Sequence, residues 1–264
     1  MEQIRITKKG SLLKSITIIL VIAVVFMSAV NLVNLDFQKF FDRLSNVPDV
    51  LKRMMAIDFS IVPEAILSII TSLSLAFLTL VIAVILSTFL SFLAASNIAP
   101  SKSLSLTIKG VLAIIRAVPS LVWGLMVIAS IGFGYTSGFV AMMFPALGFL
   151  IKTFTGSIED AGDEIIEAMK STGASWLNII FHGLIPLCIT SFVSWITIRF
   201  ESNVSSSIEL GIIGVGGIGL LLTQSINSYN YAQTTTLVIM ICILMICIEL
   251  VVTKVKNSIK YGSN

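Results

Sequence analysis

Charge, histidine and cysteine are all scarce in this sequence. Only 12% of the residues are charged, too few to cover the surface of an ordinary soluble domain. The three cysteines, Cys188, Cys242 and Cys247, fall inside apolar stretches, where a cysteine behaves as a small apolar residue. The single histidine, His182, has no cysteine or aspartate at ligand spacing, so no metal site is expected. The small basic excess suggests membrane topology rather than nucleic-acid binding.

Apolar residues are abundant, and they gather in runs long enough to cross a bilayer. A transmembrane helix needs about 20 consecutive, mostly apolar residues. Lipid accommodates only helices and closed barrels, and the alternating pattern of barrel strands is absent. The runs therefore predict an all-α polytopic membrane protein. We expect about six transmembrane helices, at Leu12–Leu35, Ala65–Ala95, Leu106–Ile131, Gly138–Phe154, Ile185–Ser207 and Thr234–Lys254.

Basic residues at both ends of the chain predict its orientation. They are Arg5, Lys8, Lys9 and Lys14 before the first run, and Lys254, Lys256 and Lys260 at or after the end of the last. No small-residue cleavage site follows the first run, so we expect no cleavable signal peptide. By the positive-inside rule the N-terminus is cytoplasmic, and six crossings return the C-terminus to the cytoplasm.

The stretch from Asp36 to Glu64 separates the first span from the others. Its apolar residues recur at three- and four-residue spacing, which predicts an amphipathic helix broken by Pro48. Such a helix suits the membrane interface, and a platform for an external binding protein is the alternative. We therefore divide the chain into residues 1–64, with the tail, first span and external loop, and residues 65–264, the core transmembrane domain.

The third span contains the sequence Arg116-Ala117-Val118-Pro119-Ser120. Pro119 lacks a backbone donor, so we expect a kink there. A charged side chain at the depth of Arg116 is expected to face other helices or water. The alternative is that Arg116 extends to the inner membrane surface from a helix that begins deeper.

Between the fourth and fifth spans lies a polar stretch with two short predicted helices. Its acidic residues suit the N-terminus of a helix over Asp163–Ser171. Gly173 supplies the turn, because glycine tolerates the left-handed conformation that ends a helix. A second helix is expected over Ser175–His182, with Pro186 starting the next membrane helix. His182 is interpreted as an interface residue and not as a catalyst.

Two features follow in the fifth span and beyond it. Helical spacing puts Arg199, Ser202, Asn203 and Ser206 on one face, which is expected to line a water-accessible path, while Glu201 points elsewhere, toward a basic group on another helix. The glycines after the span are Gly211, Gly214, Gly216, Gly217 and Gly219. Three of them form G-x-G-x-x-G, but without a βαβ unit this is not a dinucleotide site. Contact with an anion and close packing of an outer gate both remain open.

The polar stretch resembles the EAA loop of ABC-importer permeases. The family pattern is Glu-Ala-Ala, three residues, Gly, nine residues, Ile, one residue, Leu-Pro. Glu167, Ala168, Gly173 and Pro186 match it, whereas Met169, Gly183 and Ile185 replace Ala, Ile and Leu. In related transporters a helix of this loop fits a cleft on the ATPase. We call residues 158–186 the EAA-like loop.

From about Ala65 to the C-terminus the chain also resembles the permeases of phosphonate ABC importers. The resemblance rests on RFESNV followed by GIIGVGGIG, on RAVPSLVW, and on STGAS in the EAA-like loop. Ser205 departs from it, since many relatives have Arg after the Asn-Val pair. This resemblance implies the fold of a type I importer permease, which is a MetI-like fold.

The resemblance also implies a function and a set of partners. The chain is expected to be the permease subunit of an ATP-driven importer in a bacterial cytoplasmic membrane, with phosphonate, phosphite or a phosphate ester as cargo. It is not an enzyme and binds no cofactor, since ATP and Mg²⁺ belong to the partner ATPase. The other expected partners are an ABC ATPase dimer, a second permease copy or paralogue, an extracellular or periplasmic phosphonate-binding protein and the lipid bilayer, with no nucleic acid. A permease for an amino acid such as methionine is the nearer alternative, and a secondary transporter is the more distant one.

The expected site residues fall into three groups. The ATPase-coupling residues are Glu167, Ala168, Gly173, Ala174 and Pro186. The residues of the translocation path are Arg116, Arg199, Glu201, Ser202, Asn203 and Ser206. The gate or packing residues are Pro119, Gly211, Gly214, Gly216, Gly217 and Gly219.

Overall fold

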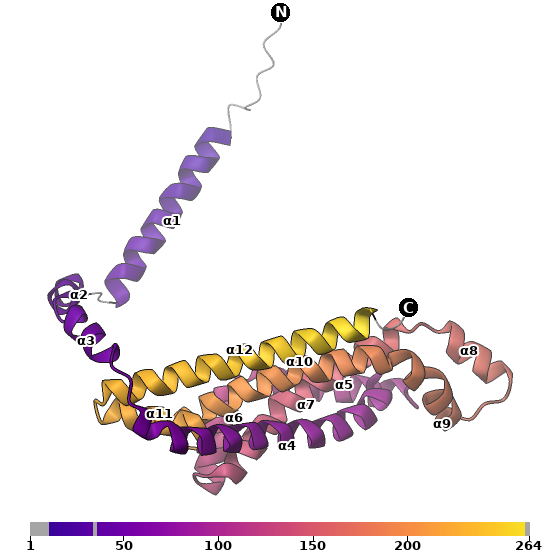
Figure 1. The fold of residues 1–264 in the computed structure, drawn as a ribbon. Coiled ribbons are helices and arrows are strands. Elements are labelled where there is room, and N and C mark those ends of the chain that lie inside the picture. The colour runs from indigo at the N-terminus through magenta and orange to yellow at the C-terminus, as the bar shows by residue number, and fades with distance from the viewer. Residues whose placement is uncertain (1–10, 34–35, 262–264) are drawn as a thin grey trace, which may run out of the picture. The chain divides into compact units, whose positions relative to one another are not determined.

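The computed structural model describes residues 11–33 and 36–261, and the regular elements in these ranges are all helices (Figure 1). Arg5, Lys8 and Lys9, which entered the topology prediction, lie outside the described residues. The chain divides into two compact units, Met1–Lys52 and Arg53–Asn264.

The first unit contains one long apolar helix and an amphipathic segment. Helix α1 spans Ser11–Val33, and its stretch Lys14–Val33 is long and apolar enough to cross a membrane. The amphipathic segment forms two short helices, α2 over Phe37–Leu44 and α3 over Val47–Met54, which continues past the unit boundary. Pro48 lies in the first turn of α3, where its missing N–H removes no helical hydrogen bond, so the break falls just before it.

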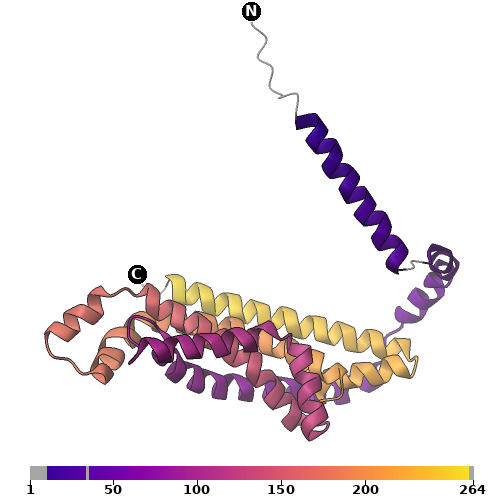
Figure 2. The ribbon, with the colours of Figure 1, turned by 180° about the vertical axis from the view of Figure 1, so that it is seen from behind.

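The second unit is a bundle of long helices with short ones at its ends. Its elements are the 3₁₀ turn η1 (Phe59–Ile61), α4 (Val62–Ala94), α5 (Lys102–Ala117), α6 (Ser120–Ile131), α7 (Tyr135–Asp160), α8 (Glu164–Ser171), α9 (Trp176–Asn178), the π-helical η2 (Ile179–Leu184), α10 (Ile185–Ile212), α11 (Gly217–Asn227) and α12 (Tyr231–Tyr261). Helix α7 packs against α4, α5, α6 and α10, and α10 also packs against α12 (Figures 1 and 2).

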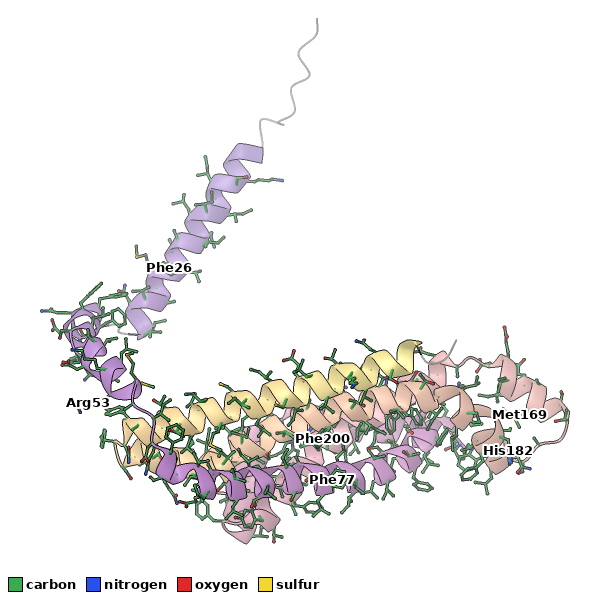
Figure 3. All side chains as sticks on the ribbon, in the orientation of Figure 1. Phe26, Arg53, Phe77, Met169, His182 and Phe200 are labelled. Carbon is green, nitrogen blue, oxygen red and sulfur yellow. The ribbon has the colours of Figure 1, made fainter. Side chains whose placement is uncertain are left out.

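Small side chains allow the central helices to approach closely. One face of α4 presents a row of fully buried small residues to its neighbours. The row comprises Ala65, Ser72, Ala76, Thr79, Ala83 and Ser87. Several large apolar side chains of α4, such as Phe77, project away from the bundle (Figure 3). This distribution is typical of a membrane bundle, in which small residues form the helix contacts and large apolar residues contact lipid.

Among the described residues, five helical segments are long and apolar enough to span a membrane, and the pair α5 and α6 makes a sixth if it is counted as one span. The expectation of about six is met, but the third span is not the single helix expected over Leu106–Ile131. Helices α5 and α6 meet at an angle of 89°. Val118, which precedes Pro119, is extended with ψ 123°, because the proline ring disfavours the helical conformation for the residue before it. The expected kink at Pro119 is therefore a sharp break.

The loops divide between the two ends of the bundle. The loop between α4 and α5 contacts the end of α7 and the start of α9, since Ser96 N–H donates to Glu159 over 2.7 Å and the Trp176 indole donates to the Ile98 carbonyl over 2.8 Å. Helices α8 and α9 and the C-terminal end of α12 lie at this same end (Figures 1 and 2). The glycine-rich turn before α11 lies at the other end. The EAA-like loop, Lys102 and the C-terminal end of α12 thus share one end of the bundle.

Candidate functional site

The EAA-like loop begins at a polar junction around Glu159. One carboxylate oxygen of this residue, Oε1, accepts from the backbone N–H and the hydroxyl of Ser96, over 2.7 and 2.6 Å, and from the Lys109 ammonium over 2.7 Å. Nearby, the Asn97 amide donates to the Ile158 carbonyl over 3.0 Å. These bonds join the loop after α4, the middle of α5 and the end of α7, so the first residues of the EAA-like loop are tied to three membrane helices. Sequence reasoning did not identify Lys109 as part of this junction.

Helix α8 presents the pattern residues to solvent. Glu164 and Glu167 lie in its first turn and Lys170 in its last, an arrangement that favours the helix dipole. Glu167 and Ala168 are exposed, whereas Ile166 is buried against the rest of the loop. The helix matches the predicted segment, with Asp163 at its N-cap. An exposed acidic face backed by one buried anchor is suited to contact with another protein.

Gly173 ends α8 in a Schellman motif. Its φ is +79°, in the left-handed region that residues other than glycine adopt only with strain. The Gly173 N–H donates to the Lys170 carbonyl over 3.0 Å, and the Ala174 N–H donates to the Met169 carbonyl over 3.1 Å. The turn inferred from the sequence is therefore present, and it fixes the direction in which the chain leaves α8.

The second half of the loop differs from the prediction. A helix does start after Ser175, whose side chain caps Trp176–Asn178, but it does not end at His182. It continues through the π-helical turn η2 into α10 without interruption. The Ile185 N–H reaches back five residues to the Ile180 carbonyl, and this wider turn accommodates Pro186, which cannot donate and would crowd an α-helical turn. The loop is thus rigidly continuous with a membrane helix.

Met169 and Gly183 pack against each other across this loop. A Cβ atom on Gly183 would lie only 2.6 Å from Met169 Sδ and 3.4 Å from the Ile165 side chain. The two residues are the positions where the EAA pattern has Ala and Ile. Met169 is thus larger than the usual Ala, Gly183 is smaller than the usual Ile, and the Met169 side chain fills the space that a side chain at position 183 would occupy. His182, beside Gly183, is exposed (Figure 3).

The polar stripe expected on the fifth span is divided between the interior and the surface. Arg199 is only 7% exposed, with its guanidinium 5.8 Å from the centre of the Phe149 ring. Asn203 is fully buried and donates to the Ala76 carbonyl over 3.2 Å. Ser202 is exposed and Ser206 is half-buried.

Two buried polar residues of α10 keep unsatisfied atoms. Arg199 Nε and Nη2 and Asn203 Oδ1 have no hydrogen-bond partner among the described residues. The expected ion pair of Glu201 does not form among the described side chains of residues 14–33 and 36–258, whose two ion pairs are Lys39–Asp36 and Lys109–Glu159. The translocation-path residues are therefore not one continuous surface of this chain. Unsatisfied donors on a buried cation in a membrane helix require water, a ligand or another chain.

The glycine-rich segment reverses the chain between α10 and α11. Gly214, Gly216 and Gly217 have positive φ angles of 102°, 123° and 71°. A Cβ on Gly219 would lie 2.0 Å from the Ile208 carbonyl, and one on Gly211 would lie 2.6 Å from the Gly216 carbonyl. Backbone therefore meets backbone, which only glycine allows.

The remaining glycines of this turn are covered by side chains from other elements. The rings of Phe133 and Tyr135 lie where a Cβ on Gly214 or Gly216 would be, and the Ser72 hydroxyl lies beside Gly217. The Ile218 N–H donates to this hydroxyl over 3.1 Å. These are contacts of close packing between the turn and the elements around it.

The break at Pro119 is also stabilised by packing. The Trp123 indole donates across the break to the Ile115 carbonyl over 3.2 Å, satisfying an acceptor that the end of α5 leaves free. The same ring stacks on Phe144 of α7 with 4.1 Å between ring centres. Arg116 precedes the break and is exposed, with its aliphatic stem against Gly148 of α7.

Comparison with known proteins places this architecture in a family. The profile of the family described as "Binding-protein-dependent transport system inner membrane component" matches residues 87–257. The chain is 32% identical to the phosphate-import permease protein PhnE of Mycolicibacterium smegmatis over 168 residues, which are 64% of this chain and 32% of the relative. It is 27% identical to the phosphite transport system permease protein PtxC of Stutzerimonas stutzeri, over 81% of this chain and 78% of the relative.

The chain is also similar to a methionine permease and to a solved structure of a methionine transporter. The chain is 27% identical to the methionine import system permease protein MetP of Bacillus subtilis over 60% of its length and 75% of the relative. A chain of an inward-facing structure of the MetNI methionine ABC transporter superposes with a TM-score of 0.66 at 18% identity, over 77% of this chain and 99% of that one. This likeness shows that the fold is that of a type I importer permease. The protein belongs to the family of inner membrane components of binding-protein-dependent transport systems, and it is the non-catalytic, multi-pass permease subunit of an ABC importer.

Proposed function

We propose that this permease forms the membrane path for a phosphorus oxyanion, a phosphonate, phosphite or phosphate ester. The observation that supports this is the set of relatives named for phosphate or phosphite transport, which align over up to 82% of the chain. The motifs RFESNV and GIIGVGGIG agree with it. The cargo would be delivered by an external binding protein, and the family's ATPase would supply the energy.

The test is the specificity of the cognate binding protein. Titration calorimetry with methylphosphonate, phosphite, phosphate and methionine should give tight binding for one of the phosphorus compounds and none for methionine. The assembled importer in proteoliposomes should then take up that compound when ATP is supplied. Tight binding of methionine alone would support the second candidate, an amino-acid permease, which the similarity to MetP over 60% of the chain favours. Uptake driven by an ion gradient without ATP would contradict both.

We further propose that the EAA-like loop docks into the ATPase at the cytoplasmic end, with both termini of the chain on that side. Glu167, Ala168, Gly173, Ala174 and Pro186 would form this coupling surface. The second half of the loop, from Trp176, continues into α10 as one helix, and Met169 of α8 packs on Gly183 in it, so a displacement of α8 would be passed to the membrane helix. A second permease copy or paralogue would complete the path.

Charge reversal on α8 tests this docking. Glu167→Lys should reduce the amount of ATPase that copurifies with the permease and uncouple ATP hydrolysis from uptake. Glu164→Lys makes the same change one turn earlier, outside the pattern, and should have a smaller effect. If the unmodified permease, Glu167→Lys and Glu164→Lys copurify equal amounts of ATPase, Glu167 is not part of the interface. Gly173→Asp should uncouple as well, since it strains the turn at φ +79°.

The path itself is proposed to border Arg116, Arg199, Glu201, Ser202, Asn203 and Ser206. The unsatisfied atoms of Arg199 and Asn203 support this, because a hydrated path would satisfy them. Pro119 and the glycines Gly211, Gly214, Gly216, Gly217 and Gly219 would form the rigid frame of the gate. Uptake measured with Arg199→Ala and Arg199→Lys, at equal assembly, tests the path. Normal uptake by the alanine variant would exclude Arg199 from it.

A further inference from the structure

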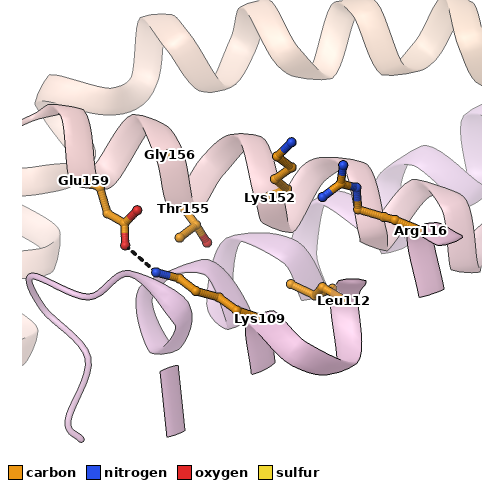
Figure 4. A pocket seen from close by; sticks show the side chains of 7 residues that line it. All are labelled: Lys109, Leu112, Arg116, Lys152, Thr155, Gly156 and Glu159. Carbon is orange, nitrogen blue, oxygen red and sulfur yellow. Dashed lines mark hydrogen bonds and ion pairs between the residues drawn. The ribbon is translucent and has the colours of Figure 1, made fainter. Parts of the chain in front are cut away.

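Helices α5 and α7 line an open cavity that no sequence motif predicted, and four of its lining residues are charged. Its volume is about 330 Å³. Two stripes at helical spacing face each other across it: Lys109, Leu112 and Arg116 on α5, and Lys152, Thr155, Gly156 and Glu159 on α7 (Figure 4). Residues three, four or seven apart lie on one side of a helix, so each helix turns one side with two charged residues toward the cavity.

The cavity holds more positive than negative charge. Three cationic side chains line it, and Glu159 is its one carboxylate. Glu159 is engaged by Lys109 over 2.7 Å. Within residues 11–33 and 36–261 no carboxylate lies within ion-pair distance of Arg116 or Lys152. Two positive charges, both exposed, therefore line the cavity without a counter-ion from the described chain.

Arg116 is held in place by a glycine. A Cβ on Gly148 would lie 2.8 Å from Arg116 Cγ and 3.6 Å from its Cδ, so the arginine stem rests on bare helix backbone of α7. Gly148 is one helical turn before Lys152. In Figure 4 the guanidinium extends along α7 toward Lys152, and the Lys109–Glu159 pair lies further along the same cavity. The two unpaired cations thus come from different helices and converge.

We infer that this cavity binds a tetrahedral phosphorus oxyanion, held by Arg116 and Lys152. The inference rests on the proposed function and gives it an internal binding site. A guanidinium offers two parallel N–H donors that match phosphate or phosphonate oxygens, and an ammonium adds a compact charge. Like charges in or near a membrane are stabilised when an anion lies between them.

Glu159 carries the negative charge at one end of the cavity, beside Lys109. Its carboxylate already neutralises Lys109 and would repel an anion that moved toward that end. The anion is therefore held by two cations instead of three, which weakens its binding. Neutralising Glu159 should free Lys109 and tighten anion binding, the opposite of the effect of neutralising either cation.

The experiment uses the full-length permease with its ATPase in nanodiscs of phosphatidylcholine, and radiolabelled inorganic phosphate and methylphosphonate as probes at constant ionic strength. Arg116→Gln and Lys152→Gln should each weaken binding about tenfold, as expected for loss of one charge-assisted contact. Glu159→Gln should tighten binding severalfold. Lys102→Gln, on α5 but outside the cavity, is the matched control and should bind as the unmodified protein does.

A second set of nanodiscs contains phosphatidylglycerol, since a lipid headgroup carries the same phosphorus oxyanion. If this lipid displaces the radiolabelled probes, and is retained on purification except by the Arg116→Gln/Lys152→Gln double variant, then the site exists and its occupant is lipid. If the probes bind equally well in both lipids, and the double variant loses this binding, the site exists and its occupant is the cargo.

Two results would overturn the inference. One is equal binding of both probes and of phosphatidylglycerol by the double variant and the unmodified protein. The other is the absence of binding by the unmodified protein at millimolar probe. Neither depends on the specificity of the binding protein. A binding protein that rejects every phosphorus compound defeats the proposed cargo, whereas unchanged probe binding by the double variant defeats this site.

Discussion

The contact between Met169 and Gly183 gives the sharpest prediction for the EAA-like loop. Restoring the family's residue at one position alone, with Gly183→Ile, should destabilise the loop, because even the Cβ would lie 2.6 Å from Met169 Sδ. Restoring both, with Met169→Ala in the same chain, should recover the packing. The two substitutions are therefore expected to be harmful singly and tolerated together.

The expected magnitudes follow from packing. Overfilling a well-packed site destabilises by about 1–3 kcal/mol, and we take about 2 kcal/mol for Gly183→Ile. Met169 is partly exposed, so Met169→Ala should cost about 1 kcal/mol, below the range for fully buried residues. Additive behaviour would give about 3 kcal/mol for the double variant. We expect about 1 kcal/mol or less, which is a coupling of about 2 kcal/mol and within the range seen for residues in contact.

The assay is a double-mutant cycle read in two ways. Thermal unfolding of the detergent-solubilised importer gives the stability of each variant, and ATP-driven uptake in proteoliposomes gives its coupling. Gly110→Ile is the control, because a Cβ on Gly110 has no atom within 4 Å. Gly183→Ala should be milder than Gly183→Ile, since the Met169 thioether can rotate away from a single methyl group.

Additivity would refute the reasoning. If the double variant loses the sum of the single losses to within about 0.5 kcal/mol, the two side chains do not share one space. If the double variant regains stability but not uptake, the two side chains do share one space. The loss of uptake would then show that the residue types at positions 169 and 183 matter for contact with the ATPase.

Three further predictions concern other parts of the chain. Gly219→Ala should prevent assembly at ordinary temperatures, because the new Cβ would lie 2.0 Å from the Ile208 carbonyl oxygen. Gly110→Ala on α5 is the control and should be neutral. The yield of folded protein in size-exclusion chromatography measures the difference. Arg199→Met should stabilise the solubilised protein slightly while reducing uptake, since it removes a buried cation with unsatisfied donors. Hydrogen bonds from Ser60 lower the pKa of the Asp58 carboxyl. The stability that the ionised carboxylate adds is therefore complete above the usual carboxylate pKa and is lost as the pH falls through the lowered pKa. The difference in melting temperature between the unmodified protein and Asp58→Asn should shrink on acidification below about pH 4.

Several elements could be predicted because their causes are local. Pro119 breaks the helix through the conformation of the residue before it, and Gly173 ends α8 through its own backbone freedom. The break at Pro119 was underestimated, since a proline pattern does not give an angle. The end of the second loop helix was misplaced at His182, because a π-turn that absorbs Pro186 leaves no mark in residue periodicity.

The sequence by itself determined that this is a helical membrane protein, where its spans lie and which loop carries the EAA-like pattern. Those conclusions depend on long apolar runs and on motifs that are contiguous in the chain, and lipid leaves a helix no alternative. Only the tertiary structure decided which residues meet. Arg116 and Lys152 share a cavity, Met169 fills the space over Gly183, and Gly219 touches the Ile208 carbonyl because helix packing brings together positions that no spacing rule connects.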